Sequence, residues 1–203
     1  MKNYIDVKND FKNQVIEEIV SFSETDSNKD IYAIAFDCDD EAGQVCLRYS
    51  NLENFEKQKE DWDEYSDMFE PYGLNGLFGL KYSVGDFEFI ECEWSGEVDS
   101  FFDSYYFYSV GDYYGEGEAI DCICIDGKEL TDDDLADSYC EIWKRMILET
   151  IKEIKDEVRN VLNVTDDFIM FMCMHDISNE EFKDWVEKTT DCETVEHLAS
   201  IMD

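Results

Sequence analysis

The chain has 203 residues, of which 44 % are hydrophobic and 15 % aromatic, so it is long enough to fold as one domain with a full core and is no disordered acidic tail. Its 52 acidic residues against 16 basic ones give a formal net charge of −36, which excludes nucleic acid and anionic membrane surfaces as direct partners. A basic protein surface or a cation is the natural complement of such a charge.

Helices and a hairpin are predicted in the first third of the chain. Apolar residues at helical spacing predict an opening helix over residues 6–22. Two short apolar runs, IYAIAFDC (31–38) and QVCLRYS (44–50), flank the acidic stretch DDEAG and predict a β-hairpin with Gly43 in its turn. Residues 51–70 return to helical spacing, and Pro71 is expected to end that helix.

Strands are predicted over residues 77–126, where Gly-rich or acidic turns separate four apolar segments. Strand AIDCICI (119–125) places Cys122 and Cys124 on one face and isoleucines on the other, which indicates that both faces are covered. The four segments are LFGLKYSV (77–84), DFEFIECEW (86–94), SYYFYSV (104–110) and AIDCICI.

The last third predicts one long helix, one strand and two short helices. Acidic residues after Thr131 open a helix over about 131–162, whose apolar stripe makes it the spine of the domain. DFIMFMCMH (167–175) is a fully apolar strand. Two S/T-x-x-E patterns at 178–181 and 190–193 predict capping boxes that open short terminal helices.

This order of elements predicts an α+β fold over a single domain, residues 1–203, without internal repeats or linkers. We expect a largely antiparallel sheet of about five to seven strands. An N-terminal helix, the long helix at 131–162 and the short C-terminal helices would pack on that sheet.

Three stretches carry a resemblance to a known family. They are DIYAIAFDCDDEAGQVCLRYSNLENFEK, LKYSVGDFEFIECEW and ILETIKEIKDEV followed by DDFIMFMCMHDISNEE. Together they resemble bacterial domain-of-unknown-function family 4303. That family has no established reaction and so implies no catalytic residues. The resemblance implies a bacterial cytoplasmic protein of the immunity type, one that acts beside a toxin.

The eight cysteines are predicted to be reduced thiols. The amino terminus MKNYIDVKND has no apolar export region, and no run of about 18 apolar residues could span a membrane. We therefore expect a cytoplasmic location, where cysteines stay reduced and fill cores as small hydrophobic residues.

The sequence contains candidate catalytic and metal-binding residues, but their spacing does not favour either kind of site. Cys173, His175 and Asp176 could form a thiolate nucleophile with its base, but strand residues two apart lie about 7 Å apart, so a buried cysteine and an edge histidine are expected instead. Zinc held by Cys122, Cys124, Cys173 and His175 would lack the usual ligand spacing. The loop from Asp37 to Arg48 resembles a calcium loop but has Ala42 and Arg48 where glycine and glutamate are required. We expect no enzyme, no cofactor and no bound metal.

The segment from Tyr82 to Gly127 is the main candidate for function. It has twelve acidic residues and no Lys, Arg or His. Alternating carboxylates on a strand repeat at about 6.6–6.8 Å, a spacing of the same order as that of nucleic-acid phosphates. The partner-binding residues that we predict are Asp86, Glu88, Glu91, Glu93, Trp94, Glu97, Asp99, Asp103, Tyr105, Asp112, Tyr113, Tyr114, Glu116 and Glu118.

The sequence thus predicts a non-catalytic acidic binding protein. Our first interpretation is an immunity or antitoxin-type inhibitor that blocks a basic cleft of a toxin or nuclease-like enzyme. One alternative is a DNA mimic, encoded by a phage or mobile element, that inhibits a host defence protein. A second alternative is an enzyme that uses Cys173, His175 and Asp176.

Overall fold

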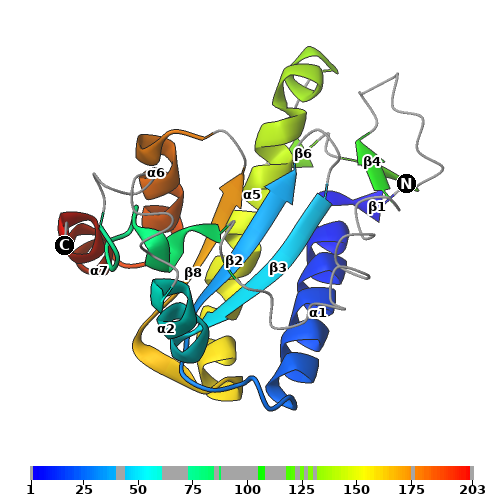
Figure 1. The fold of residues 1–203 in the computed structure, drawn as a ribbon. Helices are drawn as coiled ribbons and strands as arrows, with labels where there is room; N and C mark the ends of the chain where they lie inside the picture. The colour runs from blue at the N-terminus through cyan, green and yellow to red at the C-terminus, as the bar shows by residue number, and fades with distance from the viewer. Residues whose placement is uncertain are drawn as a thin grey trace.

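A three-stranded sheet forms the centre of the molecule. In this computed structural model the described residues are 2–39, 44–60, 73–84, 87, 105–107, 118–121, 124–125, 128–129, 132–174 and 177–201. The central sheet contains β2 (Ile31–Asp39), β3 (Gln44–Asn51) and β8 (Val164–Met174) in the order β3-β2-β8 (Figure 1). Strand β3 is antiparallel to β2 and β8 is parallel to it, so the sheet is mixed.

Two helices, α1 (Tyr4–Ser23) and α5 (Asp132–Val161), pack together on one face of this sheet. Their apolar residues recur at spacings of three and four, which places them on one side of each helix. This stripe is buried against every second residue of the strands. The buried residues of the two helices include Val7, Phe11, Val15, Ile19, Trp143, Met146, Ile147, Ile151, Ile154 and Val158.

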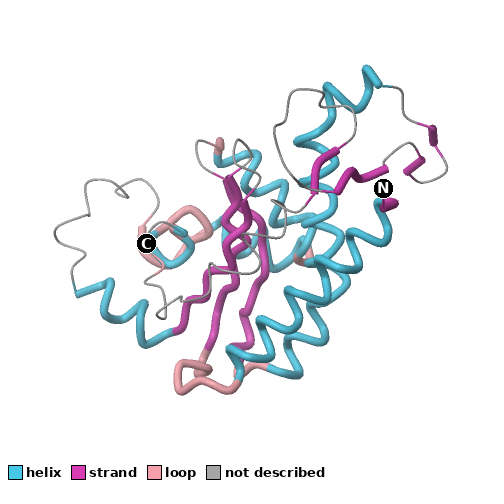
Figure 2. Tube along the Cα trace, turned by 90° about the vertical axis from the view of Figure 1, so that its right-hand side faces the viewer, coloured by secondary structure: helices cyan, strands magenta, loops and turns pink. Residues whose placement is uncertain are grey.

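The opposite face is covered by α2 (Leu52–Glu60), the 3₁₀ helix η1 (Leu80–Tyr82), α6 (Asn179–Thr189) and α7 (Cys192–Ser200). Figure 2 shows the strands between the two helical layers. Strand β2 presents the small side chains of Ala33 and Ala35 to this second layer, which leaves room for large rings beside them. The ring cluster contains Tyr32, Phe55, Tyr82, Phe87, Phe171 and Phe182.

Short strands of the described chain lie apart from the central sheet. Strands β1 (Lys2–Asn3) and β4 (Tyr105–Phe107) both pair in parallel with β5 (Glu118–Asp121). Strands β6 (Cys124–Ile125) and β7 (Lys128–Glu129) form an antiparallel pair.

An ion-pair network joins α1 to α5. The Lys8 ammonium lies 3.1 Å from Glu149 and 2.7 Å from Glu153, and Lys12 pairs with Glu153 at 2.8 Å. Partial burial works against ionisation of Glu149, but hydrogen bonds from Arg145 and Lys8 hold its pKa below the ordinary value. None of the described helices combines the length and apolarity needed to cross a lipid bilayer.

Most of the predicted elements are confirmed. The opening helix, the 31–38/44–50 hairpin, the long helix, the apolar strand and the two terminal helices all occur, within a few residues of their expected ends. The capping box of α6 is present as predicted: the Ser178 hydroxyl accepts from the backbone N–H of Glu181, whose carboxylate accepts from the backbone N–H of Ser178. The α+β class is therefore confirmed.

The prediction of a largely antiparallel sheet of five to seven strands is wrong. The central sheet is open and has three strands, and β8 joins it in parallel after the chain has returned along α5. A helix of 30 residues is about 45 Å long at 1.5 Å per residue, so it carries the chain back past the length of the sheet. Such a crossover connection produces a parallel neighbour.

The strand predicted at 77–84 is also wrong, because this segment folds back on itself. The backbone N–H of Lys81 donates to the carbonyl of Leu74 at 2.9 Å. Gly73 has φ of 67°, and a Cβ added at Gly79 would lie 2.6 Å from the carbonyl oxygen of Gly73. Glycine is thus required where the loop closes, and the chain forms turns and η1 instead of a strand.

Two smaller predictions also need correction. The start of α7 is capped by Asp191 and not by Thr190, because Asp191 accepts from the backbone N–H of Thr194 at 2.8 Å while Thr190 ends α6. The single strand predicted at 119–125 is two strands, β5 and β6, in different sheets. The predicted strand at 86–94, apart from Phe87, and the end of the second helix with Pro71 lie outside the described residues.

Candidate functional site

The carboxyl ends of the parallel strands β2 and β8 meet at one edge of the central sheet. Asp37 of β2 lies opposite Cys173 of β8 in the pairing register. Every second residue of a strand faces the same side, so Asp37 shares the face of Ala33 and Ala35, and Cys173 that of Phe171. Open α/β sheets commonly bind ligands just outside the carboxyl ends of parallel strands.

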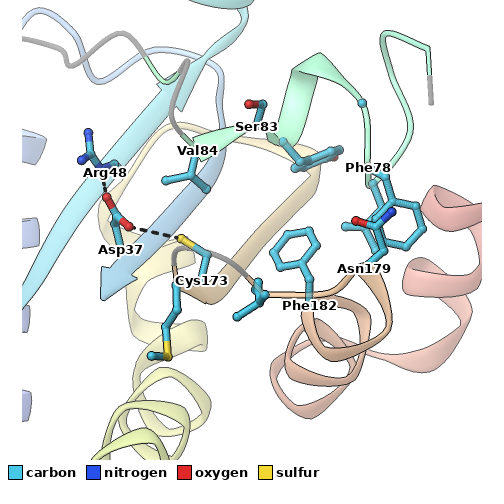
Figure 3. Close-up of a pocket in the computed structure, with 13 residues that line it drawn as sticks. Asp37, Arg48, Phe78, Ser83, Val84, Cys173, Asn179 and Phe182 are labelled. Carbon is cyan, nitrogen blue, oxygen red and sulfur yellow. Dashed lines mark hydrogen bonds and ion pairs between the residues drawn. The ribbon is translucent and has the colours of Figure 1, made fainter. Parts of the chain in front are cut away.

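A charged cluster occupies this edge. The Nε of Arg48, from β3, donates to one carboxylate oxygen of Asp37 at 2.5 Å, and the thiol of Cys173 donates to the other at 3.7 Å (Figure 3). The side chains of Asp37 and Arg48 are 12 % and 20 % exposed, so the ion pair is largely withdrawn from solvent. A partly buried pair of this kind fixes the positions of both side chains.

The Cys173 thiol is not set up as a nucleophile. Burial, and then the negative charge of Asp37, raise the pKa of this thiol well above its ordinary value. A reactive cysteine needs the opposite environment, one with positive charge and partial exposure. The neighbouring fallback residues, His175 and Asp176, lie outside the described residues.

A cavity of about 330 Å³ opens beside the charged cluster. Its walls are mainly apolar and aromatic, and Figure 3 shows Phe78, Val84 and Phe182 around it, with Asn179 at the start of α6. Phe78 and Phe182 meet edge to face, with ring centroids 6.5 Å apart. The cavity therefore has an aromatic body and one polar end.

Tyr82 also lines this cavity and is 2 % exposed. Among the described residues no group forms a hydrogen bond with its hydroxyl. Burial, followed by the charge of Asp167, raises the pKa of this hydroxyl, so it stays protonated at physiological pH. A buried hydroxyl without a partner is uncommon and calls for an explanation.

Most of the predicted partner-binding residues lie outside the residues that the structure describes. Only Tyr105 and Glu118 lie in described backbone, and they are paired across β4 and β5 in the parallel register. The other residues predicted to bind the partner, from Asp86 to Glu116, lie outside the described residues, as do the zinc candidates Cys122 and His175. Within the described chain no three His, Cys, Asp or Glu side chains converge as metal ligands.

The Asp37–Arg48 cluster was not among the predicted functional sites, although the sequence contains a signal for it. Asp37 interrupts the apolar run of β2, and Arg48 interrupts that of β3. Once the hairpin register is known, both side chains lie on the same face of neighbouring strands. A charged pair on one face of an otherwise apolar hairpin indicates a built polar site.

We expect Cys173 to react slowly with iodoacetamide in the folded protein at pH 7.5. The thiol is 7 % exposed and uncharged, whereas Cys192 is exposed at the start of α7. Although Glu196 raises the pKa of Cys192, access should make its alkylation about tenfold faster or more. Peptide mass spectrometry over a time course measures both rates. Faster alkylation of Cys173 than of Cys192 would contradict the expectation and favour the enzymatic alternative.

Comparison of the chain with protein-family models, with curated proteins and with solved structures gives no match.

Proposed function

We propose that this protein is a non-catalytic acidic binding protein that docks on a basic cleft of a toxin or nuclease-like enzyme and blocks it. It would act as an immunity or antitoxin-type inhibitor in the cytoplasm. The free thiols of Cys173 and Cys192 support a reducing compartment.

The observation that carries the proposal is the segregation of charge along the chain. Residues 61–142 contain 23 acidic residues and two lysines, a net charge of −21 in 82 residues. The other 121 residues carry −15. Self-repulsion of this size opposes folding, so a function that uses the charge is the simplest reason to keep it.

The ion pairs of the described residues point the same way. Fourteen lysines and arginines have described side chains, and at least nine of them pair with described carboxylates of this chain. The nine are Lys8, Lys12, Arg48, Lys57, Lys59, Lys81, Arg145, Lys183 and Lys188. Of these nine, Lys81 alone belongs to segment 61–142, and it pairs with Asp167 outside that segment, so the segment's own two lysines compensate little of the charge of its 23 acids.

Aromatic residues would supply the affinity that charge alone lacks. Residues 82–127 contain twelve Phe, Tyr and Trp residues among their twelve acids. Binding energy in protein interfaces concentrates in buried aromatic and arginine anchors, whereas surrounding charges mainly raise the association rate. The parallel pairing of Tyr105 with Glu118 brings an aromatic strand next to an acidic one, as such a surface requires.

The proposed partner can be found and tested with the intact chain. Affinity capture from the native host, followed by mass spectrometry, supplies a candidate that is then purified. We expect a basic protein whose association rate with this chain falls steeply between about 50 and 500 mM salt. Stopped-flow kinetics and titration calorimetry measure the rate and the affinity. An affinity that is indifferent to salt would contradict the proposal.

Charge neutralisation within the segment is the sharper test. The variant with Asp86→Asn, Glu88→Gln, Glu91→Gln and Glu93→Gln should slow association about tenfold at low salt. The matched control neutralises four exposed acids elsewhere, Glu17, Glu24, Asp26 and Glu157, and so reaches the same net charge. We expect it to slow association less than about threefold. Equal effects of the two variants would show that the total charge, and not this segment, governs docking.

A further inference from the structure

We propose that the cavity beside Asp37 binds a small aromatic amine, with its ring packed against Phe78 and Phe182 and its amino group directed at the Asp37 carboxylate. Tyr82, Ser83 and Val84, at the start of the acidic segment, line this cavity, but its ligand is a small molecule and the proposal does not depend on the protein partner proposed above.

The size of the cavity sets the first limit. A volume of about 330 Å³ lies at the lower end of small-molecule sites, which span about 300–1,000 Å³. It holds a molecule of one or two fused rings and excludes a folded peptide.

The walls determine the body of the ligand. Phe78, Tyr82 and Phe182 present aromatic surface, and Val84 and Ile177 add aliphatic surface. Aromatic rings pack well edge to face or offset against such walls, and a nearby cation is attracted to the ring faces. A planar ring fits this lining better than a sugar or a flexible polar chain.

The polar end determines the functional group. The Asp37 carboxylate accepts from Arg48 and from Cys173, and a carboxylate has about four acceptor positions. An amino group can therefore donate to it without displacing either partner. The Tyr82 hydroxyl, buried and without a hydrogen-bond partner among the described residues, provides a further polar group on the cavity wall.

The charge of the whole molecule determines the sign of the ligand. The pair of Asp37 and Arg48 is neutral by itself, but the net charge of −36 surrounds it. This field disfavours carboxylates and phosphates and favours an ammonium group. The aromatic walls and this negative field together select an aromatic cation over an aromatic anion with the same ring.

Three probes that share the indole ring system but differ in charge test the proposed ligand class: tryptamine, indole and indole-3-acetate. Titrations of the full-length chain followed by amide NMR shifts and calorimetry should give tryptamine a dissociation constant of about 1 mM or lower. Indole-3-acetate should bind at least about tenfold more weakly, with indole between the two. Butylamine, which has the charge without the ring, should bind as weakly as indole-3-acetate.

Substitutions at the cavity test whether tryptamine binds there. Val84→Trp fills the cavity and should weaken tryptamine binding about tenfold or more, whereas Val20→Trp adds the same bulk at a residue of α1 that is 41 % exposed and should change nothing. Asp37→Asn should bring tryptamine to the affinity of indole. The proposal would be overturned if indole-3-acetate bound most tightly, or if butylamine bound as tightly as tryptamine. It would also be overturned if tryptamine did not bind at about 10 mM, or if Val84→Trp left tryptamine binding unchanged.

Discussion

Replacing Phe171 with alanine is expected to lower the free energy of unfolding by about 3–5 kcal/mol. Phe171 of β8 is fully buried, and its ring contacts those of Tyr82, Phe87 and Phe182, with centroids 5.3 to 6.5 Å apart. It is the ring of β8 on which the second helical layer packs. The loss combines the transfer free energy of the ring with the cavity left behind.

Urea unfolding followed by circular dichroism measures this change, and urea is preferable to guanidinium because it does not screen the charges of the chain. A small domain has only about 5–15 kcal/mol of stability, so Phe171→Leu, with an expected loss of about 1–2 kcal/mol, keeps the test measurable if the alanine variant unfolds. The control is Phe182→Ala, which removes a half-buried ring of the same cluster and should cost about 1–2 kcal/mol. Equal losses at Phe171 and Phe182 would contradict the role given to Phe171.

Helices and strands whose apolar residues keep a regular period were predictable from the sequence. The stripe of α5, the alternation within the hairpin and the run FIMFMCM of β8 depend on local spacing, which the chain carries wherever it folds. The Ser178 capping box was predictable for the same reason, because its two hydrogen bonds involve residues three apart.

The parallel orientation of β8 relative to β2 was not predicted, although the sequence of β8 contains a signal for it. FIMFMCM is apolar at every position, which is typical of a strand covered on both faces and common in parallel pairs. The expectation of an antiparallel sheet came from the number of strand-like segments between residues 77 and 126. Of these, the segment at 77–84 forms turns, because Leu80 and Lys81 bond to Gly73 and Leu74 within the same loop. Apolar content alone does not distinguish a buried loop from a strand.

The candidate site could not be predicted from spacing because its members come from three strands and two helical segments. Cys173 was identified, but with partners next to it in sequence. In the structure its partner is Asp37, 136 residues away. Long-range contacts of this kind follow from the register of β2 with β8, which depends on the crossover through α5.

Replacing Arg48 with methionine is expected to cost about 2–4 kcal/mol, more than the removal of any exposed cation of this chain. Methionine keeps much of the side-chain volume but leaves the Asp37 carboxylate, 12 % exposed, with only the weak Cys173 donor among the described residues. The exposed pair of Lys57 and Glu53, with side chains 57 % and 71 % exposed, provides the control. Lys57→Met should cost less than about 0.5 kcal/mol, because water already screens that pair.

A double-mutant cycle separates the ion pair from other contacts of Arg48. If the cost of Arg48→Met comes from the stranded Asp37 carboxylate, adding Asp37→Asn should recover more than about half of it, since the amide carries no charge to desolvate. Urea unfolding of the four proteins of the cycle at pH 7 gives the coupling free energy, expected at about 1.5–3 kcal/mol. A coupling free energy near zero would mean that Asp37 and Arg48 contribute to stability independently. The packing of β2, β3 and β8, and not the charges of Asp37 and Arg48, would then hold the polar end of the cavity in place.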